Sequence, residues 1–236
     1  MAPPMFAVNY AAGPTVKIIF DKDTGLNFAM VLHYTQEFEW FIPVKPGDKI
    51  SNVAEITEIE PRENGSILKW VTLSINQKDE VVVKSSWAFF DRSAKVPGAG
   101  KPKYEKTGND EILWTQDMEV RKGQTFIYAE PSGDHNPIHV DNDFAVKVGL
   151  PGIILQGLCT MAFAHKTCVD NLCGPQRDPL KLRKLGVQFS KNVLPGETIT
   201  FQCYKKGDSP EGTNYGLVAT NSENQHILRN SFCQII

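Results

Sequence analysis

The stretch Glu-Pro-Ser-Gly-Asp-His-Asn-Pro-Ile-His-Val-Asp, residues 130–141, carries more information about fold and chemistry than the rest of the chain. It brings a carboxylate, an amide and an imidazole close together in the sequence: Asp134, Asn136 and His139. Gly133 and Pro137 disfavour a straight helix or a central strand, so the stretch predicts a bent loop on which the three side chains can converge. An acid/base pair with an orienting amide suits the addition or removal of water.

This stretch resembles the signature of the MaoC-like dehydratases, also called hydratase 2 enzymes. That signature is Ser-Gly-Asp-x-Asn-Pro-x-His-x-Asp, and every fixed position is present from Ser132 to Asp141. As in the family, Pro-Gly-Ile-Ile-Leu-Gln-Gly-Leu-Cys-Thr follows at residues 151–160. The resemblance implies an α+β protein with the hot-dog fold, an antiparallel sheet wrapped around a long helix. It also implies hydration of trans-2-enoyl thioesters to (R)-3-hydroxyacyl thioesters, or the reverse reaction.

The two halves of the chain share landmarks at similar spacing, which indicates duplication of one fold unit. Pro4 precedes Gly47 by 43 positions, Pro151 precedes Gly196 by 45, and each glycine lies in a Val-x-Pro-Gly-acid turn. Roughly forty residues of the second copy, including the signature, stand before Pro151, whereas three residues stand before Pro4. The pattern predicts a double hot-dog fold whose N-terminal copy is shortened and lacks the opening strand and the catalytic loop.

The expected organisation is a shortened repeat at residues 1–92, a linker at 93–109 and a catalytic repeat at 110–236. The linker is rich in Gly, Pro and Lys, as surface connections are. In the catalytic repeat the patterns predict these elements: a strand at 125–129, helices at 142–148 and 157–171, and strands at 183–190, 198–205, 215–220 and 227–234.

The composition argues against several classes of protein. Hydrophobic residues make up 41% of the 236 residues and charged residues 22%, as in ordinary globular proteins, and a net charge of −2 gives no reason to expect nucleic acid. The five cysteines are odd in number and lack metal-site spacing. They indicate reduced thiols, so we expect a cytoplasmic protein without a bound metal. No segment is long and apolar enough to span a membrane, and the N-terminus does not resemble a signal peptide.

The resemblance also assigns roles to the residues of the signature. Asp134 and His139 would both contact a catalytic water, and Asn136 would fix either that water or the loop. Without the resemblance, ordinary loop chemistry accounts for the same residues. Asp134 would then form an Asx-turn, Asn136 would cap Pro137, and His139 would be a hydrogen-bonded loop histidine.

Gly157 is the candidate donor for the oxyanion that develops on the thioester. A helix N-terminus offers unpaired backbone N–H groups and a partial positive charge, and glycine allows close approach of a ligand. Tight packing of the helix against the sheet is the alternative reason for a glycine. The family often has His before this glycine, whereas this chain has Gln156, which leaves the backbone donor in place.

Three activities follow from these patterns. The favoured one is a hydratase or dehydratase acting on a thioester of coenzyme A or acyl carrier protein, with no cofactor besides that carrier. A hot-dog thioesterase would hydrolyse the same substrates, and a non-catalytic acyl-thioester-binding or assembly subunit is the third possibility. A shortened first copy should expose apolar surface, which predicts a homodimer.

Overall fold

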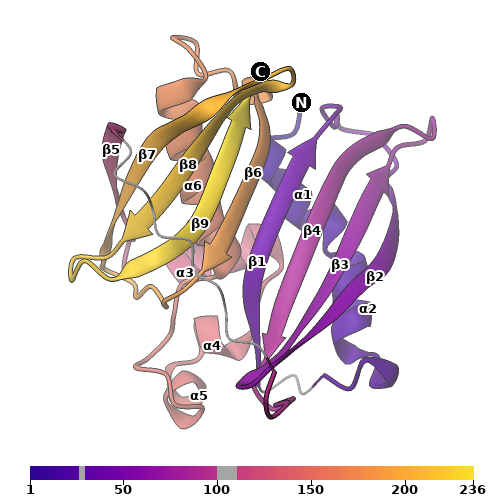
Figure 1. Cartoon of the computed structure of the whole chain (residues 1–236), viewed down its shortest axis with the longest axis vertical. Helices are drawn as coiled ribbons and strands as arrows, with labels where there is room; N and C mark the ends of the chain where they lie inside the picture. The colour runs from indigo at the N-terminus through magenta and orange to yellow at the C-terminus, as the bar shows by residue number, and fades with distance from the viewer. Residues whose placement is uncertain (27–29, 100–110) are drawn as a thin grey trace. The chain divides into compact units, whose positions relative to one another are not determined.

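The computed structural model describes residues 1–26, 30–99 and 111–236 (Figure 1). The chain divides into two compact units, one of Met1–Thr107 with Arg183–Gln188 and one of Gly108–Leu182 with Phe189–Ile236. Residues 100–109 of the predicted linker lie outside the described residues. Both units combine helices with an antiparallel sheet, so the predicted α+β class is confirmed.

The first unit is a sheet with short helices from the start of the chain. Its helices and strands are the 3-10 turns Pro4–Phe6 and Lys22–Thr24, α1 (Ala7–Ala11), α2 (Gly13–Phe20), β1 (Val31–Trp40), β2 (Ser51–Arg62), β3 (Gly65–Ile75) and β4 (Val81–Asp91). The strand order is β2-β3-β4-β1-β6, where β6 is Leu182–Phe189. Buried aromatic residues form its core, and the rings of Trp70 and Trp87 stack with centroids 6.2 Å apart.

The second unit contains the signature. Its other elements are β5 (Ile112–Glu119), α3 (Gln124–Ser132), α4 (Pro137–Val140), α5 (Asn142–Lys147), α6 (Gly157–Leu172), a 3-10 turn (Pro179–Lys181), β7 (Thr198–Ser209), β8 (Gly212–Thr220) and β9 (His226–Ile235). The strand order is β9-β8-β7-β5. The long α6 lies along one face of this sheet (Figure 1), and its buried Cys168 contacts Cys233 of β9. Burial of apolar side chains between α6 and the sheet therefore supplies the core of this unit.

One predicted element is wrong. Residues 125–129 belong to the helix α3 and not to a strand. The β-branched and aromatic run Thr-Phe-Ile-Tyr is typical of strands, but Thr125 and Ala129 are buried while Phe126 and Ile127 are 49% and 52% exposed. A buried pair four positions apart is the helical spacing, so contact with the core has overridden the local strand preference. The other helices and strands predicted for the catalytic repeat are confirmed to within a few residues.

The order of elements repeats along the chain. The helices α1 and α2 are followed by the four strands β1–β4, and α6 is followed by the four strands β6–β9, of which β6 lies in the first unit. The elements β5 and α3–α5 have no counterpart among the described residues of the first unit. The glycines of the two Pro-Gly turns have nearly the same φ, 92° at Gly47 and 93° at Gly196. In each turn the acidic side chain accepts a hydrogen bond from the backbone N–H three positions earlier, at 2.7 Å for Asp48 and 2.9 Å for Glu197.

No helix within the three described ranges is long and apolar enough to cross a membrane.

The repeated turns give a matched test of stability. Gly47→Ala and Gly196→Ala should each lower the free energy of unfolding by about 1 kcal/mol, because an L side chain is strained at this positive φ. An added Cβ meets nothing within 4 Å at Gly47 and only the side chain of Lys122, at 3.8 Å, at Gly196. Chemical denaturation measures both changes.

The control for this pair is Gly13→Ala. Gly13 begins α2 without a positive φ and has an open Cβ position, so its substitution should leave the stability unchanged or raise it. Unequal losses in the two turns would contradict their equivalence.

Candidate active site

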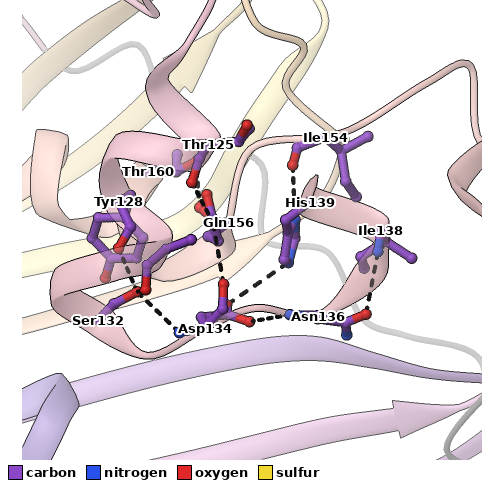
Figure 2. Close-up of polar contacts among 11 residues, drawn as sticks. Thr125, Tyr128, Ser132, Asp134, Asn136, Ile138, His139, Ile154, Gln156 and Thr160 are labelled. Carbon is purple, nitrogen blue, oxygen red and sulfur yellow. Dashed lines mark hydrogen bonds and ion pairs between the residues drawn. The ribbon is translucent and has the colours of Figure 1, made fainter. Parts of the chain in front are cut away.

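The signature forms the junction between α3 and α4, and each of its fixed residues has a local structural reason (Figure 2). Gly133 ends α3 in the left-handed conformation, with φ 71°. The side chain of Asn136 accepts a hydrogen bond from the N–H of Ile138 at 3.3 Å and so caps α4, with Pro137 at the first helical position. Asp141 caps α5 in the same way. The predicted bent loop is thus a short connection between two helix ends.

Asp134 and His139 face each other across this junction (Figure 2). His139 Nε2 lies 3.8 Å from Asp134 Oδ2, and the side chains are 9% and 38% exposed, respectively. This distance exceeds that of a good direct hydrogen bond, yet both atoms can bind one water molecule between them. The arrangement can therefore hold a water with two proton-accepting groups.

Asp134 and Asn136 also carry out the ordinary loop chemistry that the sequence left open. Asp134 Oδ1 accepts a hydrogen bond from the N–H of Asn136 at 3.3 Å, which forms an Asx-turn, while Oδ2 faces His139. The same carboxylate therefore shapes the loop with one oxygen and contacts the imidazole with the other. Two roles were predicted for Asn136, fixing the water or fixing the loop. Its carboxamide oxygen caps α4, which supports the second role.

The protonation of His139 follows from its partners. Nδ1 lies 2.7 Å from the carbonyl oxygen of Ile154. A carbonyl only accepts hydrogen bonds, so Nδ1 carries the proton and Nε2 of the neutral ring presents a lone pair toward Asp134. Burial lowers the pKa of His139 below its ordinary value of 6.5, although the Asp134 charge and the Ile154 carbonyl oppose that shift. The imidazole is accordingly neutral at pH 7 and able to act as a base.

Gln156 is a site residue that the sequence did not identify as functional. Its side chain is fully buried, and Nε2 donates to the carbonyl of Thr125 at 2.9 Å and to the carbonyl of Asp134 at 3.4 Å. The only signal in the sequence was a polar residue at the position where the resembling family often has His. Tyr128 was also missed: its buried hydroxyl has no hydrogen-bond partner among the described residues, and burial, with Cys159 and Asp134, raises the pKa of this phenol.

Gly157 begins α6, and both explanations for this glycine are supported. The preceding Gln156 makes no side-chain capping bond, so the N–H of Gly157 is one of the unpaired donors of the helix N-terminus. A Cβ added at Gly157 would lie 3.3 Å from the ring of Phe189, closer than ordinary van der Waals contact. The glycine thus permits close packing on Phe189 and leaves a backbone donor free.

His165 and the cysteines of the second unit are buried. His165 lies on α6, where burial lowers its pKa to about 4. All five cysteines are buried and free of disulfides. Within the described part of the chain, no three His, Cys, Asp or Glu side chains are grouped so that they could hold a metal ion.

Each half of the chain matches a family model whose description names a MaoC-like or a dehydratase domain. Residues 105–225, just over half of the chain, match the family described as "MaoC like domain". Residues 1–85 match the "FAS1-like, dehydratase domain region". The two matches fall on the two halves in which the sequence shows its repeated landmarks.

Two relatives carry the name enoyl-CoA hydratase 2. The probable enoyl-CoA hydratase 2 of Dictyostelium discoideum is 28% identical over 218 residues, which cover 84% of this chain and 72% of that protein. The peroxisomal enoyl-CoA hydratase 2 of Arabidopsis thaliana is 25% identical, and the match covers 76% of this chain but only 61% of the plant protein.

Solved structures establish the fold. A MaoC-like dehydratase from Phytophthora capsici superposes with a TM-score of 0.78 at 23% identity, over 89% of this chain and 73% of that one. A Mycobacterium tuberculosis protein described as having a double hotdog fold superposes with a TM-score of 0.61 at 11% identity, over 99% and 81% of the two chains. The chain belongs to the MaoC-like dehydratase family, and it is a hydro-lyase with the double hot-dog fold.

Proposed function

We propose that this protein catalyses the (R)-specific hydration of trans-2-enoyl thioesters to (R)-3-hydroxyacyl thioesters, or the reverse dehydration. The observation that carries the proposal is the neutral His139 held 3.8 Å from Asp134, a spacing that suits one shared water. The relatives named enoyl-CoA hydratase 2 support an acyl-CoA substrate, and a relative named 3-hydroxyacyl-thioester dehydratase Y supports the reverse direction.

In the hydration direction the shared water is the nucleophile. Its oxygen bonds to C3 of the enoyl group as Nε2 of His139 takes one of its protons, while Asp134 orients the water. Electrons of the C2–C3 double bond move to the thioester oxygen, where the N–H of Gly157 would stabilise the negative charge. The pair then returns a proton to C2, so no proton is consumed overall. The substrate is neither oxidised nor reduced, so the reaction calls for no cofactor beyond the carrier of the thioester.

The direct test is a panel of trans-2-enoyl-CoA substrates of increasing chain length. Hydration removes the absorbance of the conjugated enoyl thioester without releasing a free thiol. Chiral analysis of the product should give the (R)-alcohol. Release of free coenzyme A with every substrate would instead assign a thioesterase, and binding without turnover would assign a non-catalytic subunit.

We propose further that the protein is a homodimer. Large apolar side chains are exposed on the first unit, on β2 at Val53, Ile56 and Ile59 and on α2 at Val16 and Phe20. Exposed large apolar side chains that gather on one surface are commonly covered by a partner chain. Light scattering at micromolar concentration should therefore report twice the 26.3 kDa chain mass, and a stable monomer would contradict the proposal.

Asp134→Asn and His139→Ala should each lower kcat about 10²–10⁴-fold, because each removes one of the two groups that hold and deprotonate the water. His135→Ala is the matched control, since His135 lies inside the same signature but is exposed. It should keep near-native turnover. Thermal melting checks that all three variants fold, and a folded variant of either proposed catalytic residue with native kcat would remove that residue from the mechanism.

Gly157→Pro should lower kcat about 10²–10³-fold, the usual effect of losing one oxyanion donor. Proline is compatible with the first position of a helix, and Gln156 already has the extended ψ of 135° that a residue before proline requires. Gly157→Ala keeps the N–H and places its Cβ against Phe189, so its effect should appear in the melting temperature more than in kcat. Equal turnover in the two variants would leave Gly157 with a packing role alone.

A further inference from the structure

The extended segment before α6 contacts both proposed catalytic residues. The carbonyl of Ile154 accepts the hydrogen bond from His139 Nδ1 at 2.7 Å, and Gln156 Nε2 donates to the carbonyl of Asp134 at 3.4 Å. Between them, the N–H of Leu155 donates to the carbonyl of Val193 at 2.8 Å and anchors the segment. Gly157 follows Gln156 directly, and it is the first residue of α6.

The side chain of Gln156 is buried and joins two separate segments of the backbone by hydrogen bonds. It is fully buried, and its Nε2 group reaches two backbone carbonyls, that of Thr125 in α3 and that of Asp134 in the following loop. Burying an amide is unfavourable unless its groups are hydrogen-bonded, and Oε1 has no partner among the described residues. An apolar side chain would fill the same space without that cost, so filling space does not account for the amide.

The backbone of Asp134 is held on both sides. Its N–H donates to Ser132 Oγ at 3.2 Å, and its carbonyl accepts from Gln156. Ser132 belongs to the signature and lies on the same loop, whereas Gln156 comes from the start of α6, 22 residues further along the chain. The bond from Gln156 is therefore the one that ties the position of Asp134 to the helix N-terminus.

We propose that Gln156 is a positioning residue that fixes the position of the Asp134 carboxylate relative to the His139 imidazole and the N–H of Gly157. The proposal rests on the function proposed above, because it assigns Gln156 a part in the same water chemistry. Gln156 acts through the backbone of Asp134 and contacts no reacting atom. An amide does not titrate near neutral pH, so the hydrogen bond from Gln156 to the Asp134 carbonyl persists when the catalytic pair gains or loses a proton.

The test compares a variant at Gln156, the N-cap of α6, with a variant inside α6. Each variant loses buried side-chain hydrogen bonding. Gln156→Met keeps nearly the same volume without a donor. Thr167→Val is the matched control, because Thr167 Oγ1 is buried and donates to the carbonyl of Ala164 at 2.9 Å, near the other end of α6. Gln156→Glu, which keeps the shape of glutamine but presents oxygens to two carbonyls, is used in addition, so that poor folding of one variant does not decide the outcome.

The first readout is the kinetics of enoyl-CoA hydration. Gln156→Met should lower kcat about 10²-fold with KM within a few-fold of wild type, because a small displacement of a catalytic group has this effect on turnover. Gln156→Glu should lose at least as much. Thr167→Val should keep native kcat even where its melting temperature falls as far as that of the Gln156 variants. Native kcat in folded Gln156 variants, or an equal loss in Thr167→Val, would overturn the proposal.

The second readout needs no substrate. The charge of Asp134 raises the pKa of His139, so release of the Asp134 loop should lower that pKa. NMR titration of the imidazole should show the decrease in Gln156→Met and no change in Thr167→Val. Gln156→Glu is left out of this readout, because its own negative charge would raise the His139 pKa. An unchanged His139 pKa in Gln156→Met would overturn the positioning role even if wild type hydrates no thioester, and inactivity of wild type with a lowered pKa in Gln156→Met would overturn the proposed function alone.

Discussion

The hydrogen bond from His139 Nδ1 to the carbonyl of Ile154 is the constraint on which the rest of the site depends. It fixes the tautomer of the ring, and burial keeps that ring neutral, so the lone pair on Nε2 has one direction before any ligand binds. It also joins the short helix α4 to the segment that leads into α6. The base and the helix N-terminus therefore belong to one hydrogen-bonded assembly.

The residues of the signature shape the backbone of the loop, and the same residues form the proposed catalytic site. Ser132 receives the N–H of Asp134, Asn136 caps α4, and Asp141 caps α5. Asp134 divides its two oxygens between the Asx-turn and the imidazole. A substitution at any of these positions changes the path of the loop as well as its polar groups, which explains why a short pattern can specify both.

The fold class could be predicted because its signals are local, and local signals also led us to propose Asp134, Asn136, His139 and Gly157 as site residues. Periodic apolar residues located α6 and the later strands, and the signature contains Asp134, Asn136 and His139. The helix α3 was predicted as a strand because residues 125–128 are of types that favour strands. The helix shows only in the burial of Thr125 and Ala129 on one face, which depends on contact with the core. The role of Gln156 was not predictable, since its nearest partner is a backbone carbonyl 31 residues earlier and leaves no trace in residue type.

The unequal exposure of the proposed catalytic pair has a consequence for the fate of the proton. Asp134 is 38% exposed, whereas His139 is 9% exposed and has its second nitrogen occupied by Ile154. A proton taken up by His139 is therefore held where few solvent molecules can reach it, while the carboxylate side remains open to the entry of water. In the dehydration direction of the proposed reaction, such a site would favour return of the hydrogen taken from C2 to the same acyl chain over its exchange with bulk solvent.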